Sequence, residues 1–415
     1  MYRDIDRCRV CSNRVLVPIL DLGVQSLTGV FPHTADEAVT AGPLELVKCS
    51  GDKACGLVQL RQSYDPEEMY GLNYGYRSGL NASMVAHLQD VVDGVQRRID
   101  LGPGDIVLDI GSNDSTLLQR YPRKDLRLVG IDPTGRKFRE YYPKTIELIP
   151  EFFSAQVFER TFKGRKARVI SSIAMLYDLE EPLDFFAEVR EVLDDDGIWV
   201  FEQSYMPSML QMNAYDTVCH EHLEYYGLAQ IRYMTERAGF KIVGVELNPV
   251  NGGSFCVSVA KTESRHTEDT GPIEALLREE DAAGLSKLAP YESFKERVFS
   301  HRDELTGLLR RIHGEGKRVL GYGASTKGNV ILQFCGITKD LLPAIAEVNA
   351  DKFGRITPGT LIPIVSEAQA KALRPDYLLV LPWHFRENVL EREASYLRSG
   401  GSLVFPLPRI EVVGG

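Results

Sequence analysis

One strand-turn-helix segment limits what this chain can fold into more than any other feature. Residues 107–118 read VLDIGSNDSTLL, an apolar strand with Asp109 near its end, a turn at Gly111 and the start of a helix. Strand-like and helical runs alternate around it, from a helix expected at 81–100 to a last pair of strands near 240–260. This alternation predicts an α/β domain with a doubly wound sheet of five to seven strands.

The 415 residues are too many for one ordinary core, so we expect several units. The boundaries follow changes in pattern along the chain. We expect a small cysteine-containing module at 1–75, the α/β domain at 76–265, a charged helical connector at 266–314 and a second, Rossmann-like α/β domain at 315–415.

Composition excludes several classes of protein. Hydrophobic residues make up 44% of the chain and charged residues 26%, as in a globular protein, and no window approaches the roughly 18 apolar residues of a membrane span. The N-terminus lacks an apolar signal segment, so we expect a cytoplasmic protein with no membrane partner. We also expect the protein to act as a monomer. The formal charge of −10 opposes nucleic-acid binding, which depends on a basic surface.

Four of the seven cysteines lie in the N-terminal module. Cys8 and Cys11 have two residues between them, and Cys49 and Cys55 form a looser pair with five. Two such pairs predict a structural Zn²⁺ site with four thiolate ligands, and so small a module would gain most of its folding energy from the metal. The alternative is a set of unrelated thiols.

The turn at Gly111 is compatible with two nucleoside cofactors. Asp132 ends a second strand some 20 residues on, where its carboxylate can accept both hydroxyls of a ribose. NAD would need G-x-G-x-x-G, but this loop has one glycine, and Asp114 would repel a pyrophosphate. S-adenosylmethionine, with its ammonium and sulfonium, is therefore favoured over NAD and over a turn without a ligand. The expected cofactor contacts are Asp109, Gly111, Asn113, Asp132 and Pro133.

Two further motifs are ambiguous by themselves. His220 and His222 flank Glu221 in YDTVCHEHLEYYG, a pattern compatible with a metal site, a structural pair or a catalytic base. The stretch VLGYGASTKGN, residues 319–329, resembles a phosphate-binding turn, yet it matches neither the P-loop nor the dinucleotide fingerprint and could be a tight turn alone.

Seven stretches in order carry a resemblance that covers nearly the whole chain. They are the paired cysteines with LVQL, YGYRSGLNASM, LDIGSNDSTLL with GIDPT, HEHLEYY, NPVNGGSF, GYGASTKGN and LPWHFREN. Together they resemble the nucleotide-sugar C-methyltransferases, typified by the 3-C-methyltransferases of dTDP-4-keto-6-deoxy sugars. The resemblance implies a zinc module, a class I methyltransferase domain and a C-terminal domain that helps to hold a dTDP- or GDP-linked keto sugar.

The same resemblance implies roles for individual residues. His222 is expected to be the base that takes a proton from C3 of the sugar, and Glu221 its catalytic neighbour. Tyr76 and His220 are further catalytic candidates, although Tyr76 could equally pack a domain junction. The expected substrate contacts are Tyr74, Tyr225, Asn251, Ser325, Lys327 and His384.

The chain departs from this family at one position of chemical interest. Cys219 stands where a tyrosine commonly precedes HEH, so a phenol expected near the reacting carbon is missing. Two other functions stay open at this stage. Two Rossmann-like domains are compatible with an NAD-dependent nucleotide-sugar oxidoreductase, and the cysteines with a zinc-ribbon nucleic-acid adaptor.

Overall fold

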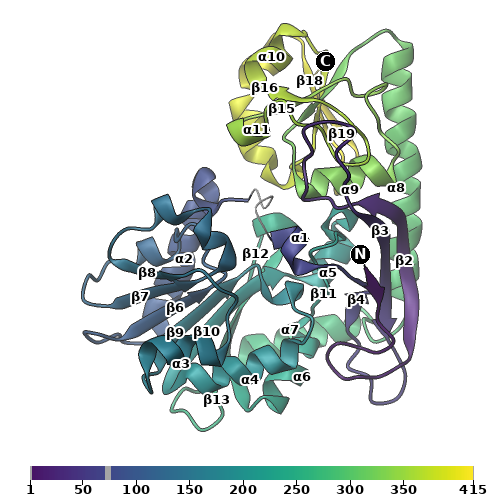
Figure 1. The fold of residues 1–415 in the computed structure, drawn as a ribbon. Coiled ribbons are helices and arrows are strands. Elements are labelled where there is room, and N and C mark those ends of the chain that lie inside the picture. The colour runs from purple at the N-terminus through teal and green to yellow at the C-terminus, as the bar shows by residue number, and fades with distance from the viewer. Residues whose placement is uncertain (1, 71–75, 415) are drawn as a thin grey trace.

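The computed structural model describes residues 2–70 and 76–414, which form three packed units (Figure 1). The N-terminal unit is built on antiparallel strands because its short apolar runs alternate with turn residues. Its sheet has the order β11-β4-β3-β2, and β1 pairs separately with β5. The elements are β1 (Arg3–Asp4), β2 (Leu16–Ser26), β3 (Ala41–Cys49), β4 (Val58–Leu60), β5 (Gln62–Ser63) and the short α1 (Pro66–Tyr70). The fourth strand of the sheet, β11 (Glu224–Tyr225), comes from the HEHLEYY stretch far along the chain.

The central unit is a seven-stranded sheet with the order β12-β13-β10-β9-β6-β7-β8. All neighbours pair in parallel except β13, which is antiparallel to both β10 and β12. This is the sheet of a class I methyltransferase. Its strands are β6 (Ile106–Ile110), β7 (Arg127–Ile131), β8 (Ile146–Ile149), β9 (Ala167–Ile173), β10 (Leu193–Ser204), β12 (Phe240–Asn248) and β13 (Ser254–Lys261).

Helices cover both faces of this sheet, and the central strand β6 is buried along its whole length. A strand covered on both faces reads as a continuous apolar run, which is why IVLDI could be recognised in the sequence. The helices of the unit are α2 (Ala82–Arg98), α3 (Ala155–Phe162), α4 (Pro182–Val192), α5 (Met206–Gln211) and α6 (Leu228–Arg237).

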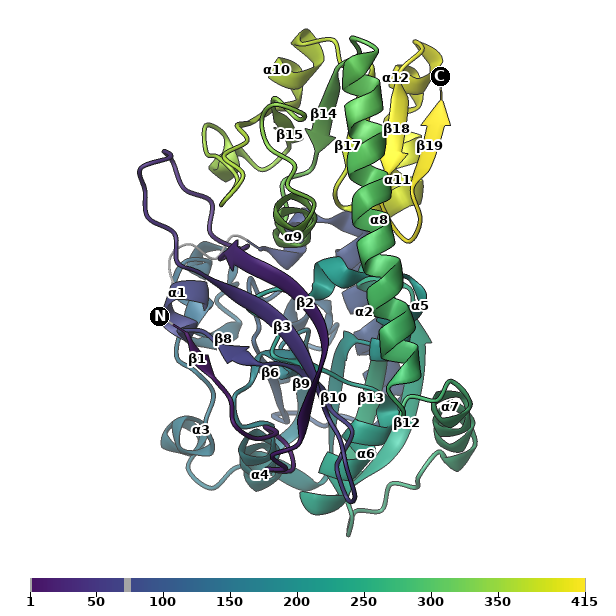
Figure 2. The same cartoon turned by 90° about the vertical axis from the view of Figure 1, so that its right-hand side faces the viewer.

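A long helix joins the central unit to the C-terminal one. After α7 (Thr270–Ala282), helix α8 (Ala289–Gly314) runs past β2 of the N-terminal sheet and reaches β14 of the C-terminal unit (Figure 2). One face of α8 is buried through residues three and four apart, such as Tyr291, Phe294 and Val298. The charged connector expected at 266–314 therefore contains two helices, and the amphipathic α8 packs against the N-terminal sheet, against α5 of the central unit and against the C-terminal unit.

The C-terminal unit holds a second sheet, with the order β16-β15-β14-β17-β18-β19, parallel apart from β19. Its strands are β14 (Val319–Tyr322), β15 (Ile345–Glu347), β16 (Ile364–Ser366), β17 (Tyr377–Val380), β18 (Ser402–Phe405) and β19 (Glu411–Gly414). Its helices are α9 (Thr326–Phe334), α10 (Glu367–Ala372), α11 (Arg386–Arg392) and α12 (Ala394–Arg398). No helix in the described part of the chain is long and apolar enough to cross a membrane.

One local expectation is wrong. The segment after Gly111 forms turns and a short 3₁₀ helix (Leu118–Arg120) rather than an α-helix. Asn113 and Ser115 both have left-handed backbone torsions, with φ of 49° and 65°, which a continuous helix cannot include. The strands β8, β16 and β19 are also absent from the sequence-based description, because short strands resemble loops in local pattern.

Candidate active site and metal centre

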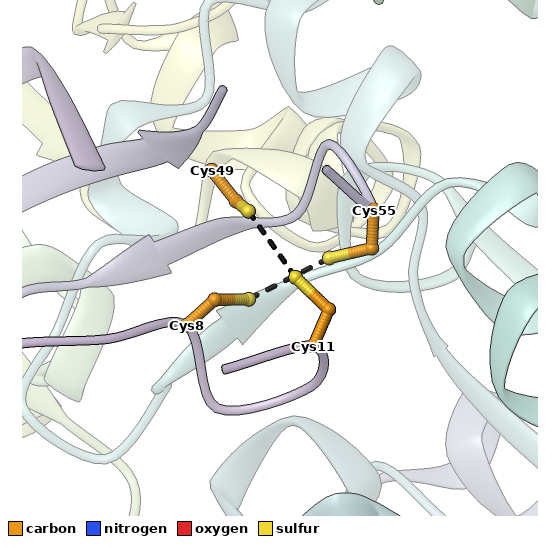
Figure 3. A group of neighbouring side chains, drawn as sticks. All are labelled: Cys8, Cys11, Cys49 and Cys55. Atoms are coloured by element: carbon orange, nitrogen blue, oxygen red, sulfur yellow. Dashed lines mark hydrogen bonds between the residues drawn. The ribbon is translucent and has the colours of Figure 1, made fainter. Parts of the chain in front are cut away.

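The four N-terminal cysteines converge on one point (Figure 3). Their sulfur atoms all lie within 4.8 Å of one another, with 3.5 Å between Cys8 and Cys55 and 3.4 Å between Cys11 and Cys49. Tetrahedral zinc with Zn–S bonds of about 2.3 Å requires sulfur separations of roughly 3.8 Å, so this thiol set fits the ion. Within residues 2–70 and 76–414 it is the one such cluster of His, Cys, Asp and Glu, and the HEH stretch is not part of another.

Turns and strand ends deliver these thiols. Cys49 ends β3, Cys55 lies just before β4, and Cys8 and Cys11 sit on either side of one turn. Hydrogen bonds from Cys55 and Cys8 hold the pKa of the Cys49 thiol far below its usual value. Asn13 also donates to the Cys49 sulfur at 3.3 Å. Hydrogen bonding with the same Cys49 raises the pKa of Cys8 to about 12 and raises that of Cys55 as well, so the thiols share their protons unequally, and an ion that displaced those protons would bind all four sulfurs as thiolates.

Two buried carboxyl groups lie at the carboxyl ends of adjacent parallel strands. Asp109 on β6 accepts a hydrogen bond from the Ser171 hydroxyl at 2.6 Å, and burial raises its pKa to about 7. Asp132, directly after β7, accepts from the backbone N–H of Asn113 at 2.7 Å, and burial raises its pKa as well. Ligands of open α/β sheets bind at this edge, and a pair of acidic groups there suits a cationic nucleoside rather than a pyrophosphate.

The loop between these two carboxyl groups packs tightly against its neighbours. Gly111 has φ of +74°, and a Cβ on it would lie 3.3 Å from the Met175 side chain, so a larger residue would crowd this turn. Pro133 begins a short 3₁₀ helix that Asp132 caps through the Thr134 N–H. These features fit a backbone that approaches a cofactor closely.

The same loop holds the segment that contains Tyr76. Asn113 accepts from the Ser78 N–H at 3.0 Å and donates to the Tyr76 carbonyl at 3.1 Å, while Asp114 accepts from the Gly79 N–H at 2.9 Å. Asp114 therefore fastens this segment, a use that its charge alone did not reveal. Tyr76 lies beside the cofactor loop and is half exposed, whereas Tyr74 lies outside the described residues.

His222 has a defined tautomer. Its Nδ1 lies 2.8 Å from the carbonyl oxygen of Thr217, which can only accept, so Nδ1 carries the proton and Nε2 keeps its lone pair. The ring packs on Tyr177, with centroids 4.3 Å apart. Burial, and then the charge of Lys327, lower the pKa of His222 to about 4. A partly buried imidazole that stays neutral at pH 7 is able to accept a proton.

A narrow cavity adjoins His222 at the carboxyl edge of the central sheet. It is lined by Tyr177, Ser204, Met206, Met209, Thr217, His222, Glu224 and Tyr225. Tyr177 follows β9 and Ser204 ends β10, so the cavity opens where the parallel strands end. This position is shared with the cofactor loop, as a methyl transfer would require.

His220 has different surroundings. It is fully buried between the central unit and the N-terminal sheet, where its Nε2 donates to the carbonyl oxygen of Gln25 at 3.2 Å. The Tyr64 ring packs edge-on against it at 4.7 Å. The two histidines therefore point to different units, because residues 218–223 form a turn rather than a strand.

Glu221 lies at the junction of all three units. Thr28 donates to its carboxylate at 3.5 Å, and a Cβ on Gly29 would stand 2.3 Å from its Oε1, so a larger residue at Gly29 would displace the Glu221 carboxylate. Burial raises the pKa of Glu221. Cys219 is buried, and the Tyr225 hydroxyl donates to the His222 carbonyl at 3.2 Å. Tyr225, expected as a substrate contact, thus also braces the turn that carries His222.

The C-terminal unit faces this turn with a cation. Lys327 donates to the carbonyl oxygen of Asn251 at 2.9 Å. Burial lowers the pKa of both His222 and His384, and the charge of Lys327 lowers both values further. Ser325 caps α9 by accepting from the Gly328 N–H at 3.0 Å. Asn251, Lys327 and His384 are therefore brought together near His222, whereas the Ser325 hydroxyl is engaged by its own helix.

Sequence reasoning missed four residues of this region. Asp216, fully buried, accepts from the Trp383 indole N–H at 2.7 Å and so joins the central and C-terminal units. Tyr177 packs on His222, and Arg9 lies 3.8 Å from buried Glu224. Only the proximity of Asp216 and Glu224 to HEH could have indicated them, since their partners are distant in sequence.

Comparison with known proteins agrees with this arrangement. Three family profiles match consecutive parts of the chain: a zinc binding domain at 8–70, a methyltransferase domain at 53–245 and a C-methyltransferase C-terminal domain at 249–408. The C-methyltransferase NovU of Streptomyces niveus is 31% identical over 419 residues, covering 100% of this chain and 98% of NovU.

Two solved structures resemble less than half of the chain. The complex of the Haloferax volcanii Trm112 methyltransferase activator with a methyltransferase has 13% identity and a TM-score of 0.36, over 44% of this chain and 94% of that one. A methyltransferase of Bacillus halodurans C-125 has 12% identity and a TM-score of 0.34, over 44% of this chain and all of that one.

A zinc-binding domain, a methyltransferase domain and a C-methyltransferase C-terminal domain follow one another along the chain, as the sequence predicted. With the full-length similarity to NovU, they assign the chain to the C-methyltransferase family, as an S-adenosylmethionine-dependent enzyme with a zinc-binding N-terminal domain.

Proposed function

We propose that this enzyme methylates C3 of a nucleotide-linked 4-keto deoxysugar, with His222 as the proton-abstracting base. The observation that carries the proposal is the hydrogen bond from His222 Nδ1 to the Thr217 carbonyl, which leaves Nε2 with its lone pair on a residue that lines a cavity of about 10 Å³, the space of one water molecule. A carbon acid next to a ketone needs such a base, and a pKa of about 4 keeps the imidazole unprotonated at neutral pH.

The proposed reaction has two steps. His222 Nε2 takes the C3 proton, and the electron pair of the C–H bond moves into an enolate whose negative charge rests on the ketone oxygen. S-adenosylmethionine, when bound, supplies an electrophilic methyl group. The enolate carbon would form the new carbon–carbon bond as the sulfur–methyl bond of the donor breaks, which would restore the ketone and release S-adenosylhomocysteine, and His222 would return its proton to solvent. Close positioning of the base and the reacting carbon can supply much of the rate.

The other residues expected at the site from the sequence have roles within the same proposal. Asp109, Gly111, Asn113, Asp132 and Pro133 would hold the cofactor, with Asp132 accepting from the ribose hydroxyls. Glu221 would orient the sugar rather than His222, because its carboxylate is directed toward Thr28 and Gly29.

The nucleotide part of the substrate would lie toward the C-terminal unit. Lys327 carries a positive charge at the start of α9, where the helix dipole also favours an anion such as a pyrophosphate. Asn251 and His384, which lie near Lys327, and Tyr74, Tyr76 and Tyr225 would contact the sugar. His220 would be structural, since its ring is buried against Gln25 and Tyr64.

A mass-spectrometric screen tests the proposal. Wild-type protein is incubated with S-adenosylmethionine and dTDP-, GDP- or CDP-linked 4-keto sugars, and we expect a gain of one methyl on carbon in at least one of them. His222→Ala serves as the inactive control. If every keto sugar stays unmodified while the protein still binds S-adenosylmethionine, the substrate class is wrong. Gel filtration and cell fractionation test the proposed monomer in the cytoplasm.

A further inference from the structure

Arg9 is a buried cation inside the metal-binding turn. It lies between Cys8 and Cys11, and only 3% of its side chain is exposed. Its guanidinium donates to the carbonyl oxygen of Leu60 at 2.6 Å, and to the Ser63 hydroxyl at 2.8 Å. A buried charge is costly unless it is well paired, so these contacts hold β4 firmly against the turn.

The same side chain faces two carboxylates of the methyltransferase domain. Arg9 Nε lies 3.5 Å from Glu180 and 3.8 Å from Glu224. The Glu224 side chain is fully buried, and within the described residues neither of its oxygens has a hydrogen-bond partner. Burial raises the pKa of Glu224 and the Arg9 guanidinium opposes that rise, so Arg9 is a positive charge beside a buried carboxyl group two residues after His222.

The backbone completes the connection from β4 to the base. Glu224 pairs with Gln59 in the sheet, and the Leu60 N–H donates to the Leu223 carbonyl at 2.8 Å. On its other side, the Leu223 N–H donates to the carbonyl of Tyr177, whose ring packs on His222. The residue that follows the base is thus held between the zinc-binding domain and the methyltransferase domain.

The metal site lies at the ends of these same strands. Cys49 ends β3 and Cys55 precedes β4, so an ion bound by the four thiols would fix the β3–β4 connection and the turn of Arg9 together. A base must be held to a fraction of an ångström, and an error of 1 Å can cost about 10²-fold in rate. A rigid metal-bound turn next to the strand that follows His222 provides such support.

We propose that Arg9 is a positioning residue, which transmits the rigidity of the zinc-bound turn through β4 and β11 to His222. The inference rests on the proposed role of His222. It means that the zinc-binding domain contributes to catalysis by placing the base, in addition to stabilising the fold.

Hydrogen exchange tests this without any substrate. In the zinc-loaded protein, Arg9→Met should speed amide exchange in a peptide covering 218–226 by about tenfold, the loss expected when charge-assisted hydrogen bonds are removed. A peptide covering β6 should be unchanged, and zinc content should stay at one ion per chain. Arg7→Gln is the matched control, because Arg7 is exposed and pairs only with Asp6 among the described residues.

Turnover provides the second readout. Arg9→Met should lower kcat by about 10²-fold and leave the KM for S-adenosylmethionine within about twofold of the wild-type value. Arg9→Lys keeps the charge but not the planar set of donors, so its kcat should lie between those of Arg9→Met and the wild type. Unchanged exchange at 218–226 overturns the inference, as does a fall in kcat that merely follows the folded fraction. If Arg9→Met does not fold, Arg9→Lys and Glu224→Gln carry the same test. Should wild type methylate no keto sugar, the proposed function fails, and the exchange result still decides whether Arg9 holds the turn.

Discussion

A turn that follows a parallel strand and begins at a glycine occurs twice beside the proposed active site, at Gly111 and at Gly323. The two turns have the same backbone arrangement but differ in the charge of their side chains. Gly111 and Gly323 have φ of +74° and +79°, and the N–H of each donates to the neighbouring parallel strand, to Ile131 and to Ala346. In both turns a carboxylate from the end of that strand accepts a backbone N–H of the loop: Asp132 from Asn113, and Glu347 from Ala324.

The two turns differ in the side chains that they present. The first has a second buried carboxyl, Asp109, and no α-helix after the glycine, whereas the second leads into α9 and presents Lys327. An acidic turn suits a cationic cofactor, and a helix start with a lysine suits an anion. The comparison teaches that the charge around a glycine turn, rather than its backbone, decides which ligand it can select.

Changing His222, the proposed base, should have the largest effect. His222→Ala should lower turnover by about 10² to 10⁴-fold, the usual contribution of a general base, while the affinities at both turns stay near wild type. The sharper measurement is deuterium uptake in heavy water at the carbon next to the ketone, with S-adenosylhomocysteine in place of the methyl donor. His220→Ala is the matched control and should retain this exchange. Loss of exchange in His220→Ala but not in His222→Ala would identify the other histidine as the base.

The acidic turn should lose its ligand when Asp132 is changed. Asp132→Ala should weaken S-adenosylmethionine binding by about 1.5 to 3 kcal/mol, the contribution of hydrogen bonds to a charged group, and calorimetry measures this directly. Affinity for the sugar nucleotide should not change. Equal cofactor affinity in the variant and the wild type would reject the assignment of Asp132 to the ribose. The acidic turn would then not be shown to select the cofactor.

The basic turn should lose affinity for its anion when Lys327 is neutralised. Lys327→Met should weaken sugar-nucleotide binding by roughly tenfold and leave S-adenosylmethionine binding unchanged. Exposed Lys339 lies on the same unit, so Lys339→Met is a control for the loss of one positive charge. If Lys327→Met instead weakens the cofactor, the two turns do not sort their ligands by charge.

The same variant should shift the pH dependence of the reaction. The lowered pKa of His222, about 4, keeps the base neutral as the pH falls well below 6.5, so the deuterium exchange should decline only near pH 4 to 5. Removing the Lys327 charge removes one cause of that lowering, and the pKa of His222 should rise. The acid limb of Lys327→Met should therefore move to higher pH. A limb that stays in place would mean that Lys327 does not act on His222.

The smallest effect is expected from the helix cap of the second turn. Ser325 accepts from the Gly328 N–H, and Ser325→Ala should lower the free energy of unfolding by about 1 kcal/mol. Thermal unfolding measures this, with Ser325→Asp as a control that keeps a cap. A loss of sugar-nucleotide affinity far larger than the loss of stability would mean that the hydroxyl contacts the ligand after all.

Several features could be predicted from the sequence because short-range pattern encodes them. The continuous apolar run of β6 and the acid-ended strand β7 indicated a parallel sheet with a nucleoside site at its edge. The two cysteine pairs indicated a metal site, since four thiols at such spacings have few other uses in a small module. The prediction of a helix after Gly111 is wrong because Asn113 and Ser115 adopt left-handed backbone torsions, which residue preference alone does not indicate.

Amino-acid sequence by itself thus determined the domain types, the metal ligands and the chemical candidates in HEH. Only the tertiary structure shows how the surroundings of the two histidines differ: Gln25, 195 positions away, holds His220, and the local carbonyl of Thr217 sets the tautomer of His222. It also joined β11 to the zinc-binding sheet and brought Lys327 close enough to His222 to lower its pKa. Local periodicity and spacing reflect contacts between near neighbours in the chain, whereas the charge and hydrogen bonds around a catalytic group come from segments that meet only when the domains pack.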